Sequence, residues 1–475
     1  MSTNVTSDRI AELRRRLGKQ LADLRRAAGI TQRDLARRTY VERSYISHIE
    51  HGRGNLNKPF WTTADTLLDA GGKLQEAFEQ LMTAILTHKD IERADLRARY
   101  QPPSQPMLTG IWNPDGAIAT LRDIVEANDI DRRDFAVLTG NSLTEFAHEW
   151  LLNPVAIEAA TSRTQRIGPS IIDGLEQITA IRRRQHDTLG GSGELLNAIR
   201  GDLHLVIAIL ERASYTDQIG TRLHAVAAEF ARIAGSVAFE SCDVGISQRF
   251  LLSGLRAAHI SGDRNLGANI LVCLSELTRE QGQLREAARL AEWALVGAKA
   301  LTPATAARVN GHLAIAAARA GDTAAAEHAA GRMLELAEIS DPAQEPPWLY
   351  WWCRGSVLHL NGWFALGAGH YDLAEAQYQE SLAYLGVEYP INRARNLLLL
   401  ATARLNLGEL EGACQAATAA ADLIRGQDAE WVRILLENFH RALERHATSA
   451  TVITFTTETA DVLSGRTSRQ PTERS

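Results

Sequence analysis

Apolar residues recur along most of this chain at intervals of three and four, the spacing that places them on one face of an α-helix. Alanine, the strongest helix former, is especially frequent between Leu301 and Ala330. The alternation of apolar and polar residues that is typical of strands is almost absent. The pattern therefore predicts an all-α fold.

Interruptions of the helical pattern divide the chain. Residues 101–106, Gln-Pro-Pro-Ser-Gln-Pro, cannot continue a helix, because proline lacks a backbone donor and restrains its predecessor. Beyond residue 448 the chain is rich in Ser and Thr, and one β-branched run at 451–456 has little else to pack against. We expect an N-terminal domain, a linker, a helical intermediate region, a repeat domain and a disordered tail, over residues 1–82, 83–110, 111–200, 201–447 and 448–475.

The N-terminal domain is predicted to contain five helices. The first ends near Ala28–Gly29, where glycine suits a left-handed stop, and Thr31 is a good N-cap for a second helix at 32–38. A third extends from about residue 42 to 50. The inner faces of the five carry, in chain order, Leu13, Leu17, Leu21 and Leu24; Leu35 and Ala36; Ile46 and Ile49; Trp61, Ala64, Leu67 and Leu68; and Leu74, Phe78 and Leu81.

Charge is unevenly distributed between this segment and the rest. Residues 9–58 hold 13 Lys/Arg and 5 Asp/Glu, a net of +8, and because the whole chain carries −6, the remainder sums to −14. Such a split suggests one domain that contacts a polyanion and another that does not. Two short helices joined by a tight turn, with a basic exterior, match the helix-turn-helix module, whose second helix enters the major groove of DNA.

With Ile46 and Ile49 turned inward, Arg43, Ser44, Ser47 and His48 point outward from the second helix of this module. Arginine can bond guanine O6 and N7 together, whereas Ser and His make looser contacts with bases. Other basic and polar residues are better placed to hold phosphates, which gives affinity without sequence information. The predicted DNA-binding set is completed by Gln32, Arg33, Arg37, Arg38, Tyr45, Arg53 and Lys58. An ordinary basic helical bundle or a protein-binding module is the alternative.

The run from Gly29 to Gly52, Gly-Ile-Thr-Gln-Arg-Asp-Leu-Ala-Arg-Arg-Thr-Tyr-Val-Glu-Arg-Ser-Tyr-Ile-Ser-His-Ile-Glu-His-Gly, closely resembles the Xre-type, lambda-repressor-like DNA-binding domain. The resemblance implies that Gln32 opens the second helix and contacts phosphate, and that Arg43 and Ser44 begin the base-reading helix. Two residues depart from the family. Tyr40 stands where the turn usually has glycine, which implies a strained or altered turn, and Glu42 replaces the usual Ser or Asn cap.

A helical-hairpin signature repeats through the second half of the chain. Its turns fall at Cys242–Asp243, Gly282–Gln283, Gly321–Asp322, Gly369–His370 and Gly408–Glu409, at nearly equal intervals except for a longer one between Gly321 and Gly369. Small residues recur after each turn and let paired helices approach closely. Residues 221–446 resemble degenerate tetratricopeptide repeats, which implies a superhelix with a concave binding surface. A non-repeating helical bundle is the alternative.

If the hairpins stack normally, positions in register on their first helices line the concave face. Arginine there could hold a carboxylate or a peptide backbone, since its fork suits planar anions, although solvated side chains would give the same pattern. The candidate ligand-binding residues are Arg232, Asn269, Glu276, Arg279, Arg308, His312, His359, Trp363 and Arg395. The densest aromatic cluster comprises Trp348, Tyr350, Trp351, Trp352, Trp363 and Phe364, and core packing is favoured there over ligand stacking.

Signatures of other chemistry were sought. The chain has no phosphate-binding Gly-rich loop, His-Glu-x-x-His pair or Gly-x-Ser-x-Gly elbow, so we expect no catalytic residues, no cofactor and no enzyme activity. His48 and His51 lack a third metal ligand nearby, and no metal site is expected. Four dispersed cysteines fit a reducing cytoplasm. No apolar stretch is as long as a membrane span requires.

The combination resembles helix-turn-helix plus tetratricopeptide regulators common in high-GC Gram-positive bacteria, and more distantly the peptide-sensing quorum regulators. The resemblance implies a homodimeric, cytoplasmic transcriptional regulator that binds double-stranded operator DNA. Its repeat domain would sense a signalling peptide, a small molecule or a protein partner. One alternative is a repeat scaffold for another protein, with the helix-turn-helix only locating it on DNA. The other is an enzyme within residues 111–200, to which we assign no chemistry.

Overall fold

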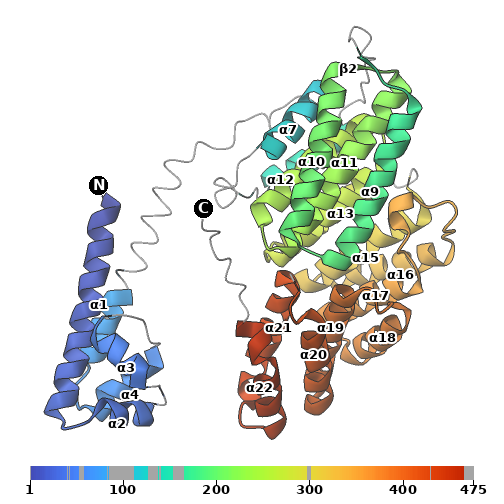
Figure 1. Ribbon diagram of the computed structural model, residues 1–475. Coiled ribbons are helices and arrows are strands. Elements are labelled where there is room, and N and C mark those ends of the chain that lie inside the picture. Colours follow the sequence, from blue (N-terminus) through green and yellow to red (C-terminus); the bar gives the residue numbers. More distant parts are fainter. Residues whose placement is uncertain are drawn as a thin grey trace. The chain divides into compact units, whose positions relative to one another are not determined.

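Helices make up nearly all of the computed structural model, so the predicted all-α class is confirmed. The chain divides into two units, Met1–Pro102 and Pro103–Ser475 (Figure 1). The division falls inside the linker predicted at 83–110, most of which lies outside the described residues. The structure describes residues 2–39, 41, 43–52, 58–82, 84, 112–126, 137, 141–152, 165–296, 301–427 and 429–464.

The first unit contains the five predicted helices. Gly29 ends the first helix with φ of 67°, and the Thr31 hydroxyl accepts a hydrogen bond from the backbone N–H of Asp34, as expected of an N-cap. Leu21, Leu35 and Ile46 are fully buried in one core. The predicted turn residues Tyr40 and Glu42 lie outside the described residues. The helices are α1 (Ser2–Ala27), α2 (Gln32–Thr39), α3 (Arg43–Glu50), α4 (Lys58–Leu67) and a helical segment at 73–82.

The second unit begins with helices that precede five helical hairpins. They are α7 (Pro114–Glu126), α8 (Asn141–Leu152), α9 (Pro169–Leu189) and α10 (Gly193–Arg212). A short parallel pair, β1 (Gln165–Arg166) with β2 (Ala213–Ser214), joins the start of α9 to the end of α10. Strands were not anticipated from the sequence, because strands this short cannot show an alternating pattern.

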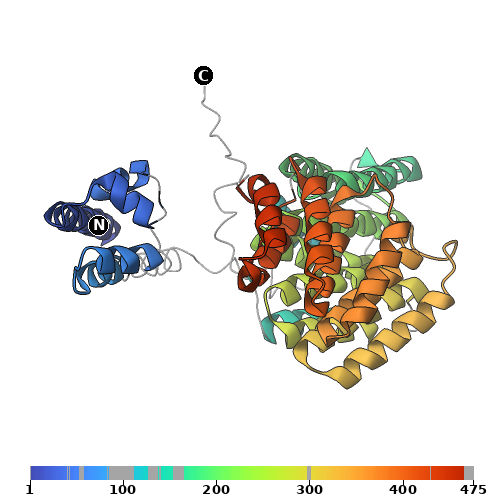
Figure 2. The ribbon, with the colours of Figure 1, turned by 90° about the horizontal axis from the view of Figure 1, so that it is seen from below.

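Five helical hairpins follow and lie side by side along the chain order (Figures 1 and 2). In each hairpin the two helices make the most extensive contacts that either of them has. The hairpins are α11 (Asp217–Glu240) with α12 (Val244–Ser261), α13 (Arg264–Glu280) with α14 (Leu284–Leu295), α15 (Pro303–Ala320) with α16 (Thr323–Glu338), α17 (Arg354–Ala368) with α18 (Tyr371–Tyr384), and α19 (Pro390–Leu407) with α20 (Leu410–Ile424).

All five predicted hairpin turns are present. Each has a residue with positive φ, between 60° and 84°, directly before the N-cap of the next helix: Cys242, Gly282, Gly321, Gly369 and Gly408. Glycine suits this region because it has no Cβ, and Cys242 is the exception. The longer interval between Gly321 and Gly369 comes from an extended connection between α16 and α17, which contains the 3₁₀ turn η3 (Pro347–Leu349).

The predicted intermediate region 111–200 is not separate from the repeats. Trp112, Phe146 and Trp150 belong to the same core as the first hairpins. The buried Arg256 of α12 lies over the rings of Trp112 and Phe146, at 4.7 and 4.9 Å from their centroids. Breaks such as Gly168–Pro169 mark ends of helices and give no information on which helices pack together.

The prediction of a disordered tail from residue 448 is wrong for the part of the tail that the structure describes. After α21 (Glu430–Ala442) and the 3₁₀ turn η4 (Glu444–His446), residues Ala450–Ser464 form α22, which packs on α20 and α21. Val452, Phe455, Thr459 and Val462 are buried. Their spacing of three or four places them on one helical face, and this packing outweighs the low helix propensity of the β-branched residues.

No helix in the part of the chain that the structure describes is both long enough and apolar enough to cross a membrane.

Candidate nucleic-acid interface and repeat cavity

The first helices of the hairpins, together with α9 and the connection before α17, line an open cavity of about 330 Å³. Helix α9 contacts α19, and α11 contacts α21, so the beginning and the end of the hairpin series meet around it. Phe239 of α11 packs against Trp431 of α21, with ring centroids 5.7 Å apart. The cavity is therefore walled by segments distant in sequence.

The structure brings the nine predicted concave-face residues together, although whether they bind a ligand stays a prediction. Seven line the cavity: Arg232, Glu276, Arg308, His312, His359, Trp363 and Arg395. The other two support the lining. Asn269 accepts a hydrogen bond from Nε of Arg308 (3.1 Å), and Arg279 lies over the ring of Trp363, 4.3 Å from its centroid.

Aromatic rings face the arginines of the cavity. The guanidinium of Arg308 lies 5.0 Å from the ring centroid of Trp351, and that of Arg395 lies 5.4 Å from the centroid of Trp431. Such contacts hold a guanidinium in place without neutralising its charge. The core interpretation of the aromatic cluster is correct for Trp348, Trp363 and Phe364, which are buried, but not for Tyr350 and Trp351, which are more than one third exposed.

Two histidines in the cavity are held in the neutral form. Burial lowers the pKa of His312 well below its ordinary value, and the charges of Arg308 and Arg279 add to the effect. Burial and the charge of Arg395 lower the pKa of His359 to about 3, although its hydrogen bond to Oδ1 of Asn396 (2.7 Å) acts in the opposite direction. At neutral pH both rings are therefore uncharged.

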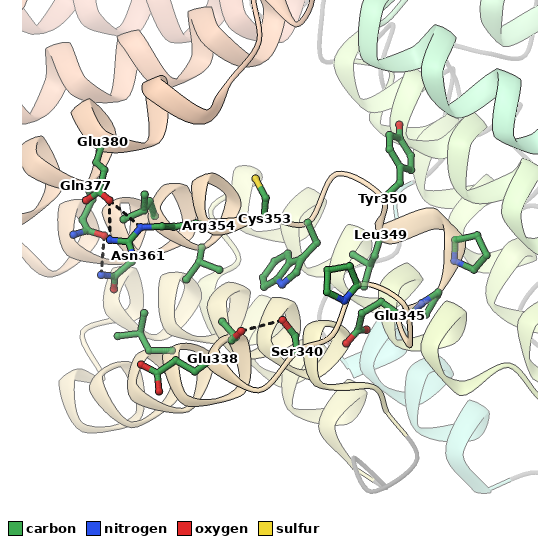
Figure 3. Close-up of a pocket in the computed structure, with 18 residues that line it drawn as sticks. Glu338, Ser340, Glu345, Leu349, Tyr350, Cys353, Arg354, Asn361, Gln377 and Glu380 are labelled. Carbon is green, nitrogen blue, oxygen red and sulfur yellow. Dashed lines mark hydrogen bonds and ion pairs between the residues drawn. The ribbon is translucent and has the colours of Figure 1, made fainter.

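A second groove, of about 750 Å³, lies beside the connection between α16 and α17 (Figure 3). Three of its charged residues have structural partners: Arg354 donates to Glu380 (2.9 Å), and Oε1 of Glu345 accepts from the backbone N–H of Ala304 (2.9 Å) at the start of α15. The sequence contained no signal for this groove, because the residues lining it come from three helices and a proline-rich loop.

In the first unit, α3 presents the outward face that the sequence predicts. Ile46 and Ile49 are buried, whereas Arg43 and His48 are exposed and Ser47 is half-buried. On α2, Arg33, Arg37 and Arg38 are exposed, and the charge of Arg37 is only loosely paired with Asp34, at 3.5 Å. The side chains of Ser44, Tyr45 and Lys58, and the whole of Arg53, lie outside the described residues.

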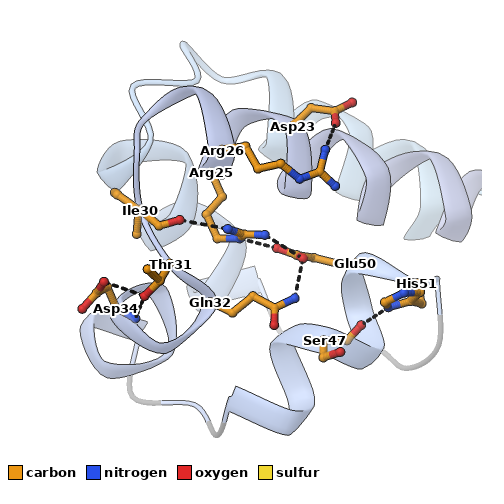
Figure 4. Close-up of polar contacts among 10 residues, drawn as sticks. All are labelled: Asp23, Arg25, Arg26, Ile30, Thr31, Gln32, Asp34, Ser47, Glu50 and His51. Atoms are coloured by element: carbon orange, nitrogen blue, oxygen red, sulfur yellow. Dashed lines mark hydrogen bonds and ion pairs between the residues drawn. The ribbon is translucent and has the colours of Figure 1, made fainter.

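A buried ion pair fixes α3 against α1 and α2 (Figure 4). Arg25 donates from Nε and Nη2 to the carboxylate of Glu50 (2.6 and 3.0 Å) and from Nη1 to the carbonyl oxygen of Ile30 (2.9 Å). Gln32 donates to the same carboxylate (2.7 Å), so the residue expected to contact phosphate is also bonded within the fold.

These contacts lower the pKa of Glu50. Burial alone would raise it, but the hydrogen bonds from Arg25 and Gln32 and the charges of Arg25 and Arg26 outweigh burial. The sequence analysis missed this network. The position of Arg25 could have indicated it, because Arg25 follows Leu21 by one helical turn and therefore lies on the apolar face of α1.

Comparison with known proteins identifies the first unit. A family model described as a helix-turn-helix domain (HTH_31) matches residues 16–78. Residues 16–78 form a helix-turn-helix domain. No curated protein matches the chain. Among solved structures, the crystal structure of BtubC (BKLC) from P. vanneervenii has 18% sequence identity over 55% of this chain and 92% of that chain, with a TM-score of 0.31. At this TM-score the likeness supports no argument about fold or function.

Close packing sets the position of α3 in the helix-turn-helix domain. Gly18 of α1 is buried, and a Cβ there would overlap the carbonyl oxygen of Ile49. The backbones of α1 and α3 therefore touch at this point, which only glycine permits. This contact holds the outward face of α3, which carries Arg43 and His48, in a defined position against α1.

Proposed function

We propose that this protein is a sequence-specific DNA-binding transcriptional regulator. The observation that carries the proposal is the helix-turn-helix domain in which α3 buries Ile46 and Ile49 and exposes Arg43 and His48. In the proposed complex α3 lies in the major groove, where Arg43, Ser44, Ser47 and His48 contact base edges. The exposed arginines of α2 contact phosphates and fix the register.

The second unit, in this proposal, is a tetratricopeptide-like receptor for a signal, and the protein acts as a homodimer of the Xre type. The gathering of the predicted concave-face residues around one cavity supports a receptor role. Two helix-turn-helix domains of a dimer would bind half-sites about one helical turn apart. Occupancy of the cavity would then change how the two domains meet the operator.

Selection of bound fragments from genomic DNA with the full chain tests the proposal. We expect enrichment of a limited set of fragments that share a motif at physiological salt concentration. Equal retention of random and genomic fragments, or of neither, would contradict sequence-specific binding. Neighbouring genes would also indicate the regulated pathway.

Two substitutions separate base reading from phosphate contact. Arg43→Ala is expected to relax base preference at one position of the operator, at a cost of about 1–3 kcal/mol in discrimination. Arg37→Ala is expected to weaken binding to all sequences alike and to lower the salt slope by about one phosphate equivalent. Lys73→Ala, on the exposed start of the segment 73–82, is the control that should change neither. An unchanged sequence preference in Arg43→Ala would show that Arg43 is not a base contact.

A further inference from the structure

We propose that the repeat cavity binds a small organic anion with at least two negative charges and a planar ring, held by Arg232, Arg308 and Arg395. The inference deepens the receptor role proposed above and rests on it. It selects one ligand class, because a neutral or cationic compound would leave these arginines without a direct ion pair.

The charges around the cavity are unequally matched. Arg232, Arg308 and Arg395 have no carboxylate within ion-pair distance among the described residues. The carboxylates of the lining make other direct contacts: Asp187 accepts from the hydroxyl of Tyr350, Glu240 lies 3.4 Å from Nε2 of His186, and Glu276 lies 3.8 Å from Arg279. They act on Arg232, Arg395 and Arg308 only at longer range. A buried or half-buried charge is costly without a direct ion pair, so three such arginines in one cavity favour an anion that pairs with them.

Arg232 is the clearest of the three. It is half-buried on α11, its Nε is buried without a hydrogen-bond partner, and the structure gives its guanidinium no hydrogen bond or ion pair among the described residues. Arg308 donates to Asn269, and Arg395 donates to the amide oxygen of Asn392 (2.6 Å). Both bonds orient the guanidinium groups without neutralising them, which prepares them to hold an oxyanion by charge-assisted hydrogen bonds.

Buried polar atoms without partners form an independent indication of a ligand. Nδ1 of His312, a residue only 2% exposed, and Nε1 of the buried Trp348 both belong to residues that line the cavity and have no hydrogen-bond partner among the described residues. Most buried polar groups in proteins are hydrogen-bonded, so two in one cavity require an explanation. The neutral ring of His312 and the indole of Trp348 can both bond an oxygen of a bound ligand.

The size and the rings of the cavity define the rest of the ligand. A volume of about 330 Å³ is near the lower end of the range of roughly 300–1,000 Å³ for small-molecule sites, which favours a compact molecule over an extended peptide. Trp351, which is 38% exposed, offers a ring beside Arg308. A planar ring can stack on it while its anionic groups reach the guanidinium groups.

The test uses isothermal titration of the full chain with defined probes at constant ionic strength. Benzene-1,3,5-tricarboxylate carries the proposed charge and ring, benzene-1,3,5-tricarboxamide has the ring without charge, and inorganic pyrophosphate has charge without a ring. We expect the tricarboxylate to bind and to quench tryptophan fluorescence, and the tricarboxamide to bind at least tenfold more weakly. If pyrophosphate binds more tightly than the tricarboxylate, the anionic group of the ligand is a phosphate, and the inference that the ligand contains a planar ring is wrong.

Arg232→Gln is the decisive variant. Because Arg232 has no direct hydrogen bond or ion pair to lose among the described residues, the unliganded variant should fold, while its affinity for the tricarboxylate falls about tenfold or more. Arg308→Gln and Arg395→Gln should weaken binding similarly, whereas Arg332→Gln, on the exposed surface of α16, should not. Equal affinity of wild type and Arg232→Gln, or equal binding of tricarboxylate and tricarboxamide, would overturn the inference. Genomic-fragment selection is measured without these probes, so failure of DNA recognition would be seen separately.

Discussion

At the scale of single residues, the position of α3 depends on Glu50. Its carboxylate is 5% exposed and joins Arg25 of α1 to Gln32 of α2. Removing one member of a buried pair leaves the other charge without compensation, which costs more than a surface ion pair contributes. We predict that Glu50→Ala lowers the free energy of unfolding by about 3 kcal/mol and weakens DNA binding. Urea unfolding measures the first effect. Glu12→Ala, which breaks the exposed pair with Arg15, should cost less than about 1 kcal/mol.

The lowered pKa of Glu50 gives this contribution a pH dependence. A carboxyl whose pKa is lower in the folded than in the unfolded state stabilises the fold above the unfolded pKa, and loses that effect as pH falls through the folded pKa. The difference in unfolding free energy between wild type and Glu50→Gln should therefore be constant near pH 7 and shrink below about pH 4.5. A difference that grows on acidification would contradict the assignment.

Local chemistry was predictable for residues whose role depends on near neighbours. The cap at Thr31 and the hairpin turns at Gly282 and Gly321 follow from the residue type and its place between two helices. The pairing of Arg25 with Glu50 does not, because the two residues are 25 positions apart and many other acidic residues could be the partner.

At the scale of elements, the contact between α1 and α3 depends on the absence of a side chain at Gly18. Alanine normally favours a helix over glycine by about 1 kcal/mol. Here its Cβ would overlap backbone, which cannot move aside as a flexible side chain can. We predict that Gly18→Ala destabilises the protein by about 1–3 kcal/mol and weakens operator binding. Gly201→Ala, in α10 with open space around it, should be neutral or stabilising by up to about 1 kcal/mol. If both substitutions stabilise, α1 and α3 do not touch at Gly18.

Helix α22 is a structural part of the second unit. Phe455 is 1% exposed and packs edge-on against Phe439 of α21, with centroids 5.6 Å apart. Phe455→Ala should cost about 3–5 kcal/mol, because it opens a cavity in this core. Ile453→Ala, close by in sequence but 55% exposed, should change the unfolding free energy by less than about 1 kcal/mol. Thermal unfolding of both variants measures the difference. If residues 450–464 were a dispensable tail, the two variants would have the same stability.

The periodic spacing of apolar residues predicted most of the helices. The helix propensity of individual residues was misleading where it conflicted with that spacing. The five helices of the first unit and the five hairpins have apolar stripes in residues that favour helix. In α22 the β-branched residues Thr451, Val452 and Ile453 suggested otherwise, yet the buried positions repeat every three or four residues. Propensity is a weak preference per residue, and tertiary packing overrides it.

At the scale of the whole molecule, the sequence predicted which residues share the concave face, but it did not predict which helices meet across that face. The register of the first helices placed Arg232, Arg308 and Arg395 together, because hairpin repeats bring equivalent positions into line. The contact of α9 with α19 brings two walls of the cavity together, and it depends on the cumulative curvature of the stack. A small rotation in each repeat sets that curvature, and the sequence pattern does not contain it.

The proposed receptor role and the proposed DNA-binding role require a measurable coupling between the two sites. A ligand shifts an equilibrium only if it binds two states with different affinity, and the coupling is reciprocal. We predict that saturating benzene-1,3,5-tricarboxylate changes the Kd for a selected operator, and that saturating operator changes the Kd for the tricarboxylate by the same factor. A tenfold change in each would correspond to about 1.4 kcal/mol. Fluorescence anisotropy measures the first constant and titration calorimetry the second.

A polyanion could also weaken DNA binding directly, by occupying the arginines of α2 in place of phosphates. The two mechanisms have different dose dependence. Coupling through the cavity levels off once the cavity is full, whereas direct competition continues to grow with anion concentration. Ionic strength must be held constant, since DNA affinity falls steeply with salt. Arg232→Gln, with its helix-turn-helix domain unchanged, should lose the saturable effect. If it keeps the full effect, the anion acts at the DNA-binding surface and the repeat cavity does not transmit the signal.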